Sequence, residues 1–168
     1  MHIDRASPAG HSFTGASAKF AVTKSTSSNT PLTEHLAYLL AQANREINRQ
    51  LELRLSTEGV PVEQWRILKV LSDNEGHSMG ELADAVLLNH PTLTKMVDRM
   101  VSDSLVYRRQ DAEDRRKVLM FISDRGKALC KRLNLLAAGQ EAHIQHNYGD
   151  KATGELKRLL ENLIDAAS

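Results

Sequence analysis

Apolar residues recur every three or four positions along most of the chain, which is the spacing of one face of an α-helix. The first such stripe covers residues 32–55. Gly59 is expected to end this helix, and Pro61 to open a second one. Later stripes predict a long helix that Ser123 caps and a last helix over residues 156–164.

Two shorter helices are predicted between residues 78 and 100. Ser78 and Glu81 have the spacing of a capping box at the start of the first. Asn89 or His90 caps the second, and Pro91 occupies its first turn, where the missing N–H costs nothing. The buried stripe of this second helix is Leu93, Met96, Val97 and Met100, which leaves Thr92, Thr94, Lys95, Asp98 and Arg99 on other faces.

A change of pattern follows these helices. VYRR (106–109) and VLMFI (118–122) are typical of β-strands, and the eight residues between them predict a long hairpin loop. The loop contains five consecutive charged residues, EDRRK (113–117). The predicted fold class is therefore mainly α with a small β-hairpin (α+β).

Charge is unevenly distributed, although the formal net charge of the chain is only +1. Residues 89–132 carry eleven Lys/Arg against six Asp/Glu, a net charge of +5, whereas residues 32–88 carry five against nine, a net charge of −4. A local basic region of this kind indicates a nucleic-acid partner.

The order of these elements suggests how DNA would be bound. Two short helices joined by a tight turn and followed by a charged hairpin are typical of a winged helix-turn-helix, whose second helix enters the major groove. The hairpin arms would present Arg115 and Arg116 to phosphates or to a narrow minor groove. Asp114, two residues before Arg116, is expected to brace that guanidinium.

Three segments resemble the MarR family of transcriptional regulators: EQWRIL (63–68), GELADAVLLNHPTLTKMVDRM (80–100) and DAEDRRKVLMFISDRG (111–126). The resemblance covers about residues 33–168. It implies an obligate homodimer, a palindromic double-stranded operator, usually repression, and often release by a small ligand. On this basis the predicted DNA-binding residues are His90, Pro91, Thr92, Thr94, Lys95, Arg99, Arg108, Asp114, Arg115 and Arg116.

Residues 1–31 lie outside the resemblance; they are rich in Ser, Thr, Ala and Gly without a helical or strand period, which predicts a flexible N-terminal tail. In the rest of the chain the resemblance implies a helical dimerisation region at residues 32–58 and 123–168, and the winged helix-turn-helix at residues 60–122. The family commonly has Gly before the first hairpin strand, where this chain has Ser104. A left-handed backbone there would cost Ser about 1 kcal/mol relative to Gly.

In the fold that the resemblance implies, the first, second and fifth helices meet between the dimerisation region and the DNA-binding region, and a small-molecule pocket is expected there. Arg pairs a carboxylate bidentately, Tyr or His bonds a ring substituent, and Trp supplies a flat face, so a small aromatic carboxylate is the favoured effector. The alternative is that the two arginines involved are surface ion-pair partners of Glu46, Glu63 or similar acids. The predicted ligand-binding residues are His35, Tyr38, Arg45, Trp65 and Arg66.

Other classes of protein are disfavoured. The single cysteine, Cys130, excludes an internal disulfide, and no apolar run reaches the roughly 18 residues of a membrane span, so a cytoplasmic protein without a membrane partner is expected. No P-loop, C-x-x-C or S-x-x-K motif occurs, so we expect no enzyme, cofactor or metal. The remaining rival is a winged-helix protein-interaction module without a ligand response.

Overall fold

The computed structural model describes residues 30–167. The predicted tail therefore lies outside the described residues, except for its last two positions. The elements are η1 (Leu32–Glu34), α1 (Leu36–Leu55), η2 (Ser56–Glu58), α2 (Val62–Leu71), α3 (Met79–Val86), α4 (His90–Ser102), β1 (Val106–Gln110), β2 (Val118–Ile122), α5 (Asp124–Tyr148) and α6 (Asp150–Ala167).

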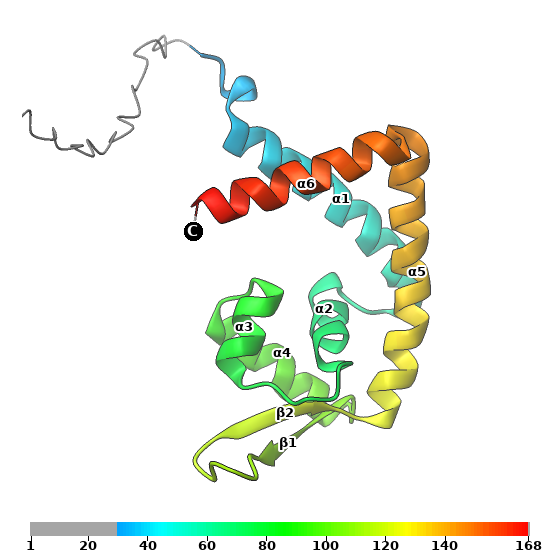
Figure 1. Cartoon of the computed structure of the whole chain (residues 1–168). Helices are drawn as coiled ribbons and strands as arrows, with labels where there is room; N and C mark the ends of the chain where they lie inside the picture. Colours follow the sequence, from blue (N-terminus) through cyan, green and yellow to red (C-terminus); the bar gives the residue numbers. More distant parts are fainter. Residues whose placement is uncertain (1–29, 168) are drawn as a thin grey trace, which may run out of the picture.

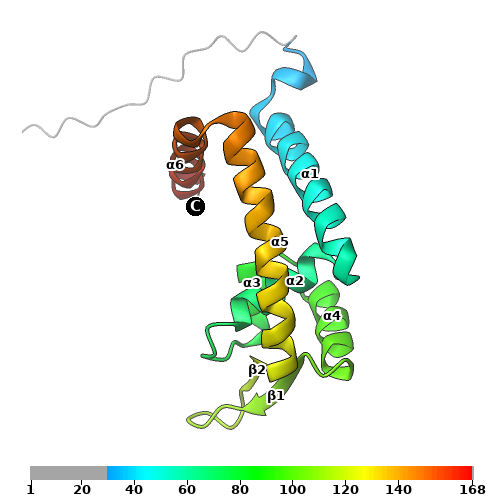
Figure 2. The ribbon, with the colours of Figure 1, turned by 90° about the vertical axis from the view of Figure 1, so that its right-hand side faces the viewer.

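The elements form two parts joined by one long helix (Figure 1). α2, α3, α4 and the β1–β2 hairpin make up the lower lobe, residues 60–122. α5 starts beside the hairpin and runs upward, packing against α2 and α1 on the way (Figure 2). α6 returns from its upper end, and we call α1 and α6 the upper helices. The predicted class, mainly helical with one small hairpin, is confirmed.

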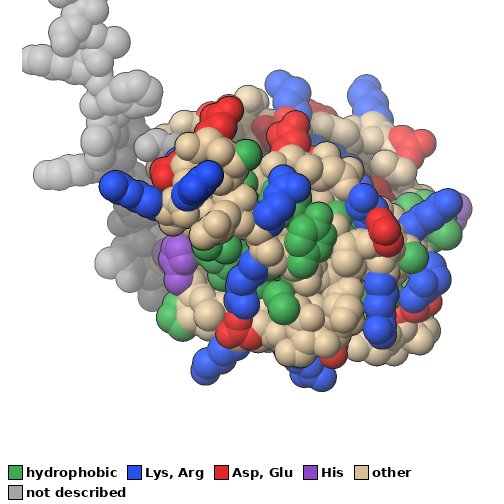
Figure 3. Space-filling model, turned by 90° about the horizontal axis from the view of Figure 1, so that it is seen from below, with side chains coloured by type: hydrophobic (Ala, Val, Ile, Leu, Met, Phe, Trp, Pro, Cys, Tyr) green, Lys and Arg blue, Asp and Glu red, His purple; other side chains and the backbone are tan. Residues whose placement is uncertain are grey.

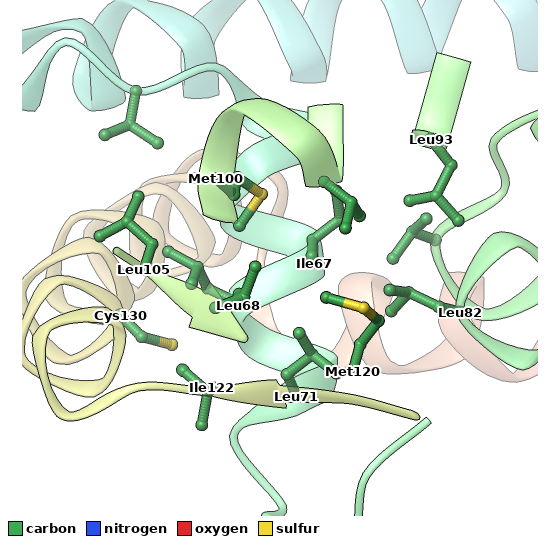
Figure 4. Close-up of a cluster of buried hydrophobic side chains, with 14 of the residues drawn as sticks. Ile67, Leu68, Leu71, Leu82, Leu93, Met100, Leu105, Met120, Ile122 and Cys130 are labelled. Carbon is green, nitrogen blue, oxygen red and sulfur yellow. The ribbon is translucent and has the colours of Figure 1, made fainter. Parts of the chain in front are cut away.

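The lower lobe is built around a continuous apolar core (Figure 4). Ile67 and Leu68 of α2 lie at its centre and have no exposed surface. Leu82 of α3 and Leu93 of α4 close it on one side, and Met120 of β2 closes it from the hairpin. Burying a side chain of this size contributes roughly 1.5–3 kcal/mol. The core therefore fixes α3, α4 and the hairpin relative to one another.

The hairpin root packs too closely for ordinary side chains. A Cβ on Gly126 would lie 2.1 Å from the carbonyl oxygen of Leu105, and one on Gly76 would lie 2.3 Å from the Phe121 ring. Glycine at both positions lets α5 and the α2–α3 segment approach the hairpin. His77 and Met120 also exchange two backbone hydrogen bonds, of 3.1 and 2.8 Å.

Two predicted boundaries were wrong. The strand expected to end at residue 109 continues to Gln110, whose partner across the hairpin is Val118, so the loop has seven residues. The first stripe does not begin the helix at residue 32, because residues 32–34 form a separate 3-10 turn and His35 is extended. The left-handed backbone expected at Ser104 is confirmed, with φ 58°.

The upper helices keep much of their apolar surface exposed. Leu36, in the first turn of α1, is 58% exposed, and Leu159 of α6 is 52% exposed. Thr153 is the single buried residue of α6 among those described. Apolar stripes left exposed in this way are typical of interaction surfaces.

Candidate nucleic-acid interface

The turn between α3 and α4 is defined by side-chain caps. Ser78 accepts a hydrogen bond from the Glu81 amide, and the Glu81 carboxylate accepts one from the Ser78 amide, so the predicted capping box is confirmed. Asn89, not His90, caps α4, through a 2.9 Å bond from the Thr92 amide to its side chain. The first cap fixes the start of α3, and the second fixes the start of α4, where exposed polar side chains begin.

One face of α4 is buried and the rest is open. Leu93, Val97 and Met100 are buried in the core, with Met96 partly buried against it. The Thr94 hydroxyl donates to the His90 carbonyl oxygen at 2.9 Å. The six predicted contact residues of this helix are all exposed: His90, Pro91, Thr92, Thr94, Lys95 and Arg99.

The tip of the hairpin is held by its own carboxylates. Asp111 accepts a hydrogen bond from the Glu113 amide at 2.8 Å, and Asp114 accepts one from the Arg116 amide at 3.0 Å. The pKa of Asp111 is lowered chiefly by the hydrogen bond from the Glu113 amide, with smaller contributions from the Asp114 amide and the charges of Lys117 and Arg109. The two carboxylates thus order the loop from within.

The prediction that Asp114 holds the Arg116 guanidinium was wrong, because Asp114 binds a different group of Arg116. Among the described residues no ion pair joins the two side chains, and Asp114 binds the Arg116 backbone amide instead. A carboxylate close in sequence reaches an amide more readily than a long, exposed guanidinium. Arg115 and Arg116 are both exposed, so their guanidinium groups remain available to an external anion.

Two arginines of β1 are already oriented. Arg108 forms an ion pair with Asp98 of α4. Arg109, which sequence reasoning missed, lies over the Phe121 ring with its guanidinium carbon 4.2 Å from the centroid. Tyr107 stacks on the same ring at 5.6 Å. The alternation of strand side chains and the aromatic at position 121 were the available signals for Arg109.

The face seen from below carries many charged side chains (Figure 3). Lys and Arg side chains project around it, with acidic and hydrophobic side chains between them. A surface of this kind attracts phosphate without being uniformly positive.

The five predicted ligand-binding residues do not line one cavity. Tyr38 and Arg45 line a shallow hollow of about 150 Å³ together with Ala41 and Gln42, all from α1. Neither Trp65 nor Arg66 is part of its lining. His35 is the exposed N-cap residue of α1.

Trp65 and Arg66 instead join helices. The Trp65 indole donates to Asn134 of α5 at 3.0 Å, and Arg66 donates to Asn48 of α1 at 2.8 Å. The alternative, that Arg45 and Arg66 are surface ion-pair partners of Glu46, Glu63 or similar acids, is not seen in the described part of the chain. Neither arginine forms an ion pair there, and Glu46 pairs with Arg49 at 2.6 Å.

The sequence does contain one enzyme-like motif. Residues 76–80 read GHSMG, the G-x-S-x-G pattern of a nucleophile elbow. Here the Ser78 hydroxyl bonds to the Glu81 carboxylate at 2.8 Å, while the His77 ring bonds to Asp73 at 2.7 Å. Ser78 has an ordinary extended backbone, with φ −66°. The motif is a helix cap, not a catalytic elbow.

Other chemistry has little support in residues 30–167. Cys130 is buried, and burial raises the pKa of its thiol. Within the described residues no group of three metal-binding side chains occurs. None of their helices is long and apolar enough to cross a membrane.

Comparison with known proteins agrees with this geometry. Residues 60–118 match the model of the MarR family. The homoprotocatechuate degradative operon repressor of Escherichia coli is 25% identical over 131 residues, which cover 78% of this chain and 88% of that protein.

Solved structures extend the likeness to the whole fold. A MarR family transcriptional regulator from Silicibacter pomeroyi DSS-3 has a TM-score of 0.74 and 29% identity, covering 83% of this chain and all of that one. A mutant MarR from E. coli complexed with operator DNA has a TM-score of 0.70 and 25% identity, covering 80% of this chain and 99% of that one.

The fold and the exposed basic elements define a winged helix-turn-helix DNA-binding protein. Over residues 60–118 the chain matches the MarR family, and its fold is that of MarR-family transcriptional regulators.

Proposed function

We propose that this protein represses transcription by binding a palindromic operator as a two-fold dimer. The observation that carries the proposal is the exposed polar face of α4, set by the core beside a hairpin whose tip arginines are free of acidic partners in the described residues. An α-helix fits the major groove, and a hairpin beside it reaches the neighbouring backbone or minor groove. The E. coli relative named above is itself an operon repressor.

Dimerisation would solve the exposure of the upper helices. Leu36 and Leu39 on α1, and Leu156, Leu159 and Leu163 on α6, present apolar surface that a symmetry mate would bury. In this proposal α1, α5 and α6 form the dimerisation region, corresponding to residues 32–58 and 123–168, and residues 60–122 form the DNA-binding region. Two α4 helices would then address half-sites about 10–10.5 base pairs apart.

The effector is proposed to be a small aromatic carboxylate that binds between α1 and α2. Arg45 lines the hollow on α1. Arg66 uses one guanidinium nitrogen to donate to Asn48, and its other N–H donors remain available to a ligand. The homoprotocatechuate of the relative's operon is a hydroxylated aromatic acid of this class. A ligand that binds one dimer shape better would change the separation of the α4 helices and release DNA.

The DNA proposal is tested by selecting duplexes from a random-sequence pool with the full-length protein, then measuring their affinity by gel shift. We expect a palindromic sequence with the half-site spacing above. Failure to enrich any sequence, together with weak binding to random duplex at low salt, would leave the protein-interaction module as the better account.

The effector proposal has a separate readout. Trp65 is the single tryptophan of the chain, so its fluorescence can be titrated with homoprotocatechuate, hydroxybenzoates and pyridine carboxylates. We expect quenching and loss of DNA binding in the wild type, and weaker binding in Arg66→Ala and Tyr38→Phe. No response to any of these acids at millimolar concentration refutes the effector assignment and leaves the DNA proposal intact.

A further inference from the structure

An acidic side chain occupies the open surface of α4, where a DNA-binding helix would be expected to avoid one. Asp98 lies three residues after Lys95 and is exposed, with 56% of its side-chain surface accessible. A carboxylate there would be repelled by phosphate unless its charge serves another group.

The group it serves is Arg108 of β1. One guanidinium nitrogen, Nη2, forms the ion pair with the Asp98 carboxylate, and the Arg108 side chain stays 44% exposed. Guanidinium has five N–H donors, so most of them remain free for a second acceptor. A planar, delocalised cation held on one side by a carboxylate has its other donors fixed in direction.

The pair also connects two elements that would touch different parts of a duplex. Arg108 faces Met120 across the hairpin, and Met120 is tied through its backbone to His77, before α3. The hairpin root is therefore fixed on one side by backbone hydrogen bonds. On the other side, towards α4, the ion pair of Asp98 and Arg108 supplies a side-chain link.

We infer that Asp98 is a positioning residue, which holds Arg108 so that its free donors bind a DNA phosphate between the major-groove helix and the hairpin. The inference rests on the proposed DNA-binding function. It assigns Arg108 a phosphate contact and gives Asp98 a role opposite to the one its charge alone would predict.

The direction of the change in DNA affinity on Asp98→Asn distinguishes a purely electrostatic role of Asp98 from a positioning role. If Asp98 acts only through its charge, Asp98→Asn removes a repulsion and tightens all DNA binding. If it positions Arg108, Asp98→Asn weakens binding to the wild-type-selected duplex by roughly tenfold and reduces the salt slope by about one phosphate. Binding to a scrambled duplex should remain equal or become tighter.

Matched variants complete the test. Asp84→Asn removes the same charge from an exposed position on α3. Asp84 has no ion pair in the described structure, so this variant should cause no loss of DNA affinity. Asp98→Glu keeps a carboxylate and should restore most of the affinity. In an Arg108→Ala background, Asp98→Asn should add no further loss.

Thermal melts of each variant, followed by circular dichroism, show that folding is unchanged. The inference is overturned if Asp98→Asn behaves like Asp84→Asn, or if its loss persists undiminished without Arg108. If the wild-type protein selects no sequence at all, the proposed function has failed, which is a different outcome from either.

Discussion

The lower lobe and the upper helices contain similar leucine stripes, but these stripes differ in how much of their surface is exposed. Leu68, Leu82 and Leu93 in the lower lobe are fully buried, whereas Leu36 and Leu159 in the upper helices are more than half exposed. Exposed apolar area forgoes about 25 cal/mol per Å² of stabilisation. The lobe therefore buries its stripes within one chain, whereas those of the upper helices would be covered only in the proposed dimer.

The largest expected effect lies in the lobe. Leu68→Ala removes a fully buried side chain from the centre of the core and should lower the free energy of unfolding by about 2–5 kcal/mol, measured by urea denaturation. Leu87→Ala, at a side chain that is 87% exposed, is the control and should change it by less than about 0.5 kcal/mol. Equal losses in both variants would contradict the assignment of the core.

Substitutions in the upper helices should weaken dimerisation and not the folding of the lobe. Leu159→Glu combined with Leu163→Glu puts two charges into the stripe of α6 and should weaken dimerisation at least about 100-fold, because buried unpaired charges are costly. Analytical ultracentrifugation measures the change. Leu87→Glu, at a lower-lobe side chain that is 87% exposed and lies outside the proposed dimerisation region, is the control. A wild-type protein that is monomeric at micromolar concentration would refute the proposal that the upper helices form a dimer interface.

Two glycines sharpen the contrast further. Gly126→Ala forces a Cβ against the Leu105 carbonyl oxygen and should cost about 1–3 kcal/mol of unfolding free energy in a thermal melt. Gly154→Ala, in α6, meets nothing within 4 Å and should stabilise that helix by up to about 1 kcal/mol. Destabilisation by Gly154→Ala would instead reveal that the dimer partner packs closely there.

The smallest expected effect is on the stability of the protein at acidic pH. Bonds from the Ser78 amide and hydroxyl lower the pKa of Glu81 below its usual 4.5. A lowered folded-state pKa means that this stabilisation is present above pH 4.5 and is lost as the pH falls through the folded pKa. Glu81→Gln should therefore reduce the drop in melting temperature between pH 5 and pH 3. An unchanged pH profile would mean that the capping box contributes nothing measurable.

Much of the lower lobe could be predicted because its signals are local. The Ser78 capping box, the Pro91 start of α4 and the left-handed Ser104 each depend on neighbours within a few residues. The helical stripes identified the buried face of α4 for the same reason.

Contacts between distant segments could not be read from the sequence. The ion pair of Asp98 with Arg108 and the stacking of Arg109 on Phe121 depend on the hairpin register, which a one-residue error in strand length obscures. The hydrogen bonds of Trp65 and Arg66 likewise depend on where α2 lies against α5 and α1. Periodicity identifies a face of a helix but not the residue that it meets.

The central claim is that the exposed α4 face and the hairpin tip bind operator DNA, and Arg116→Ala tests it most directly. Affinity for the wild-type-selected duplex is measured from 50 to 300 mM salt, with Arg158→Ala on α6 as the charge-matched control. The account predicts a loss of about 1–3 kcal/mol and a salt slope lower by about one phosphate for Arg116→Ala, with no change for Arg158→Ala. Unchanged affinity in Arg116→Ala, or equal losses in the two variants, would contradict it.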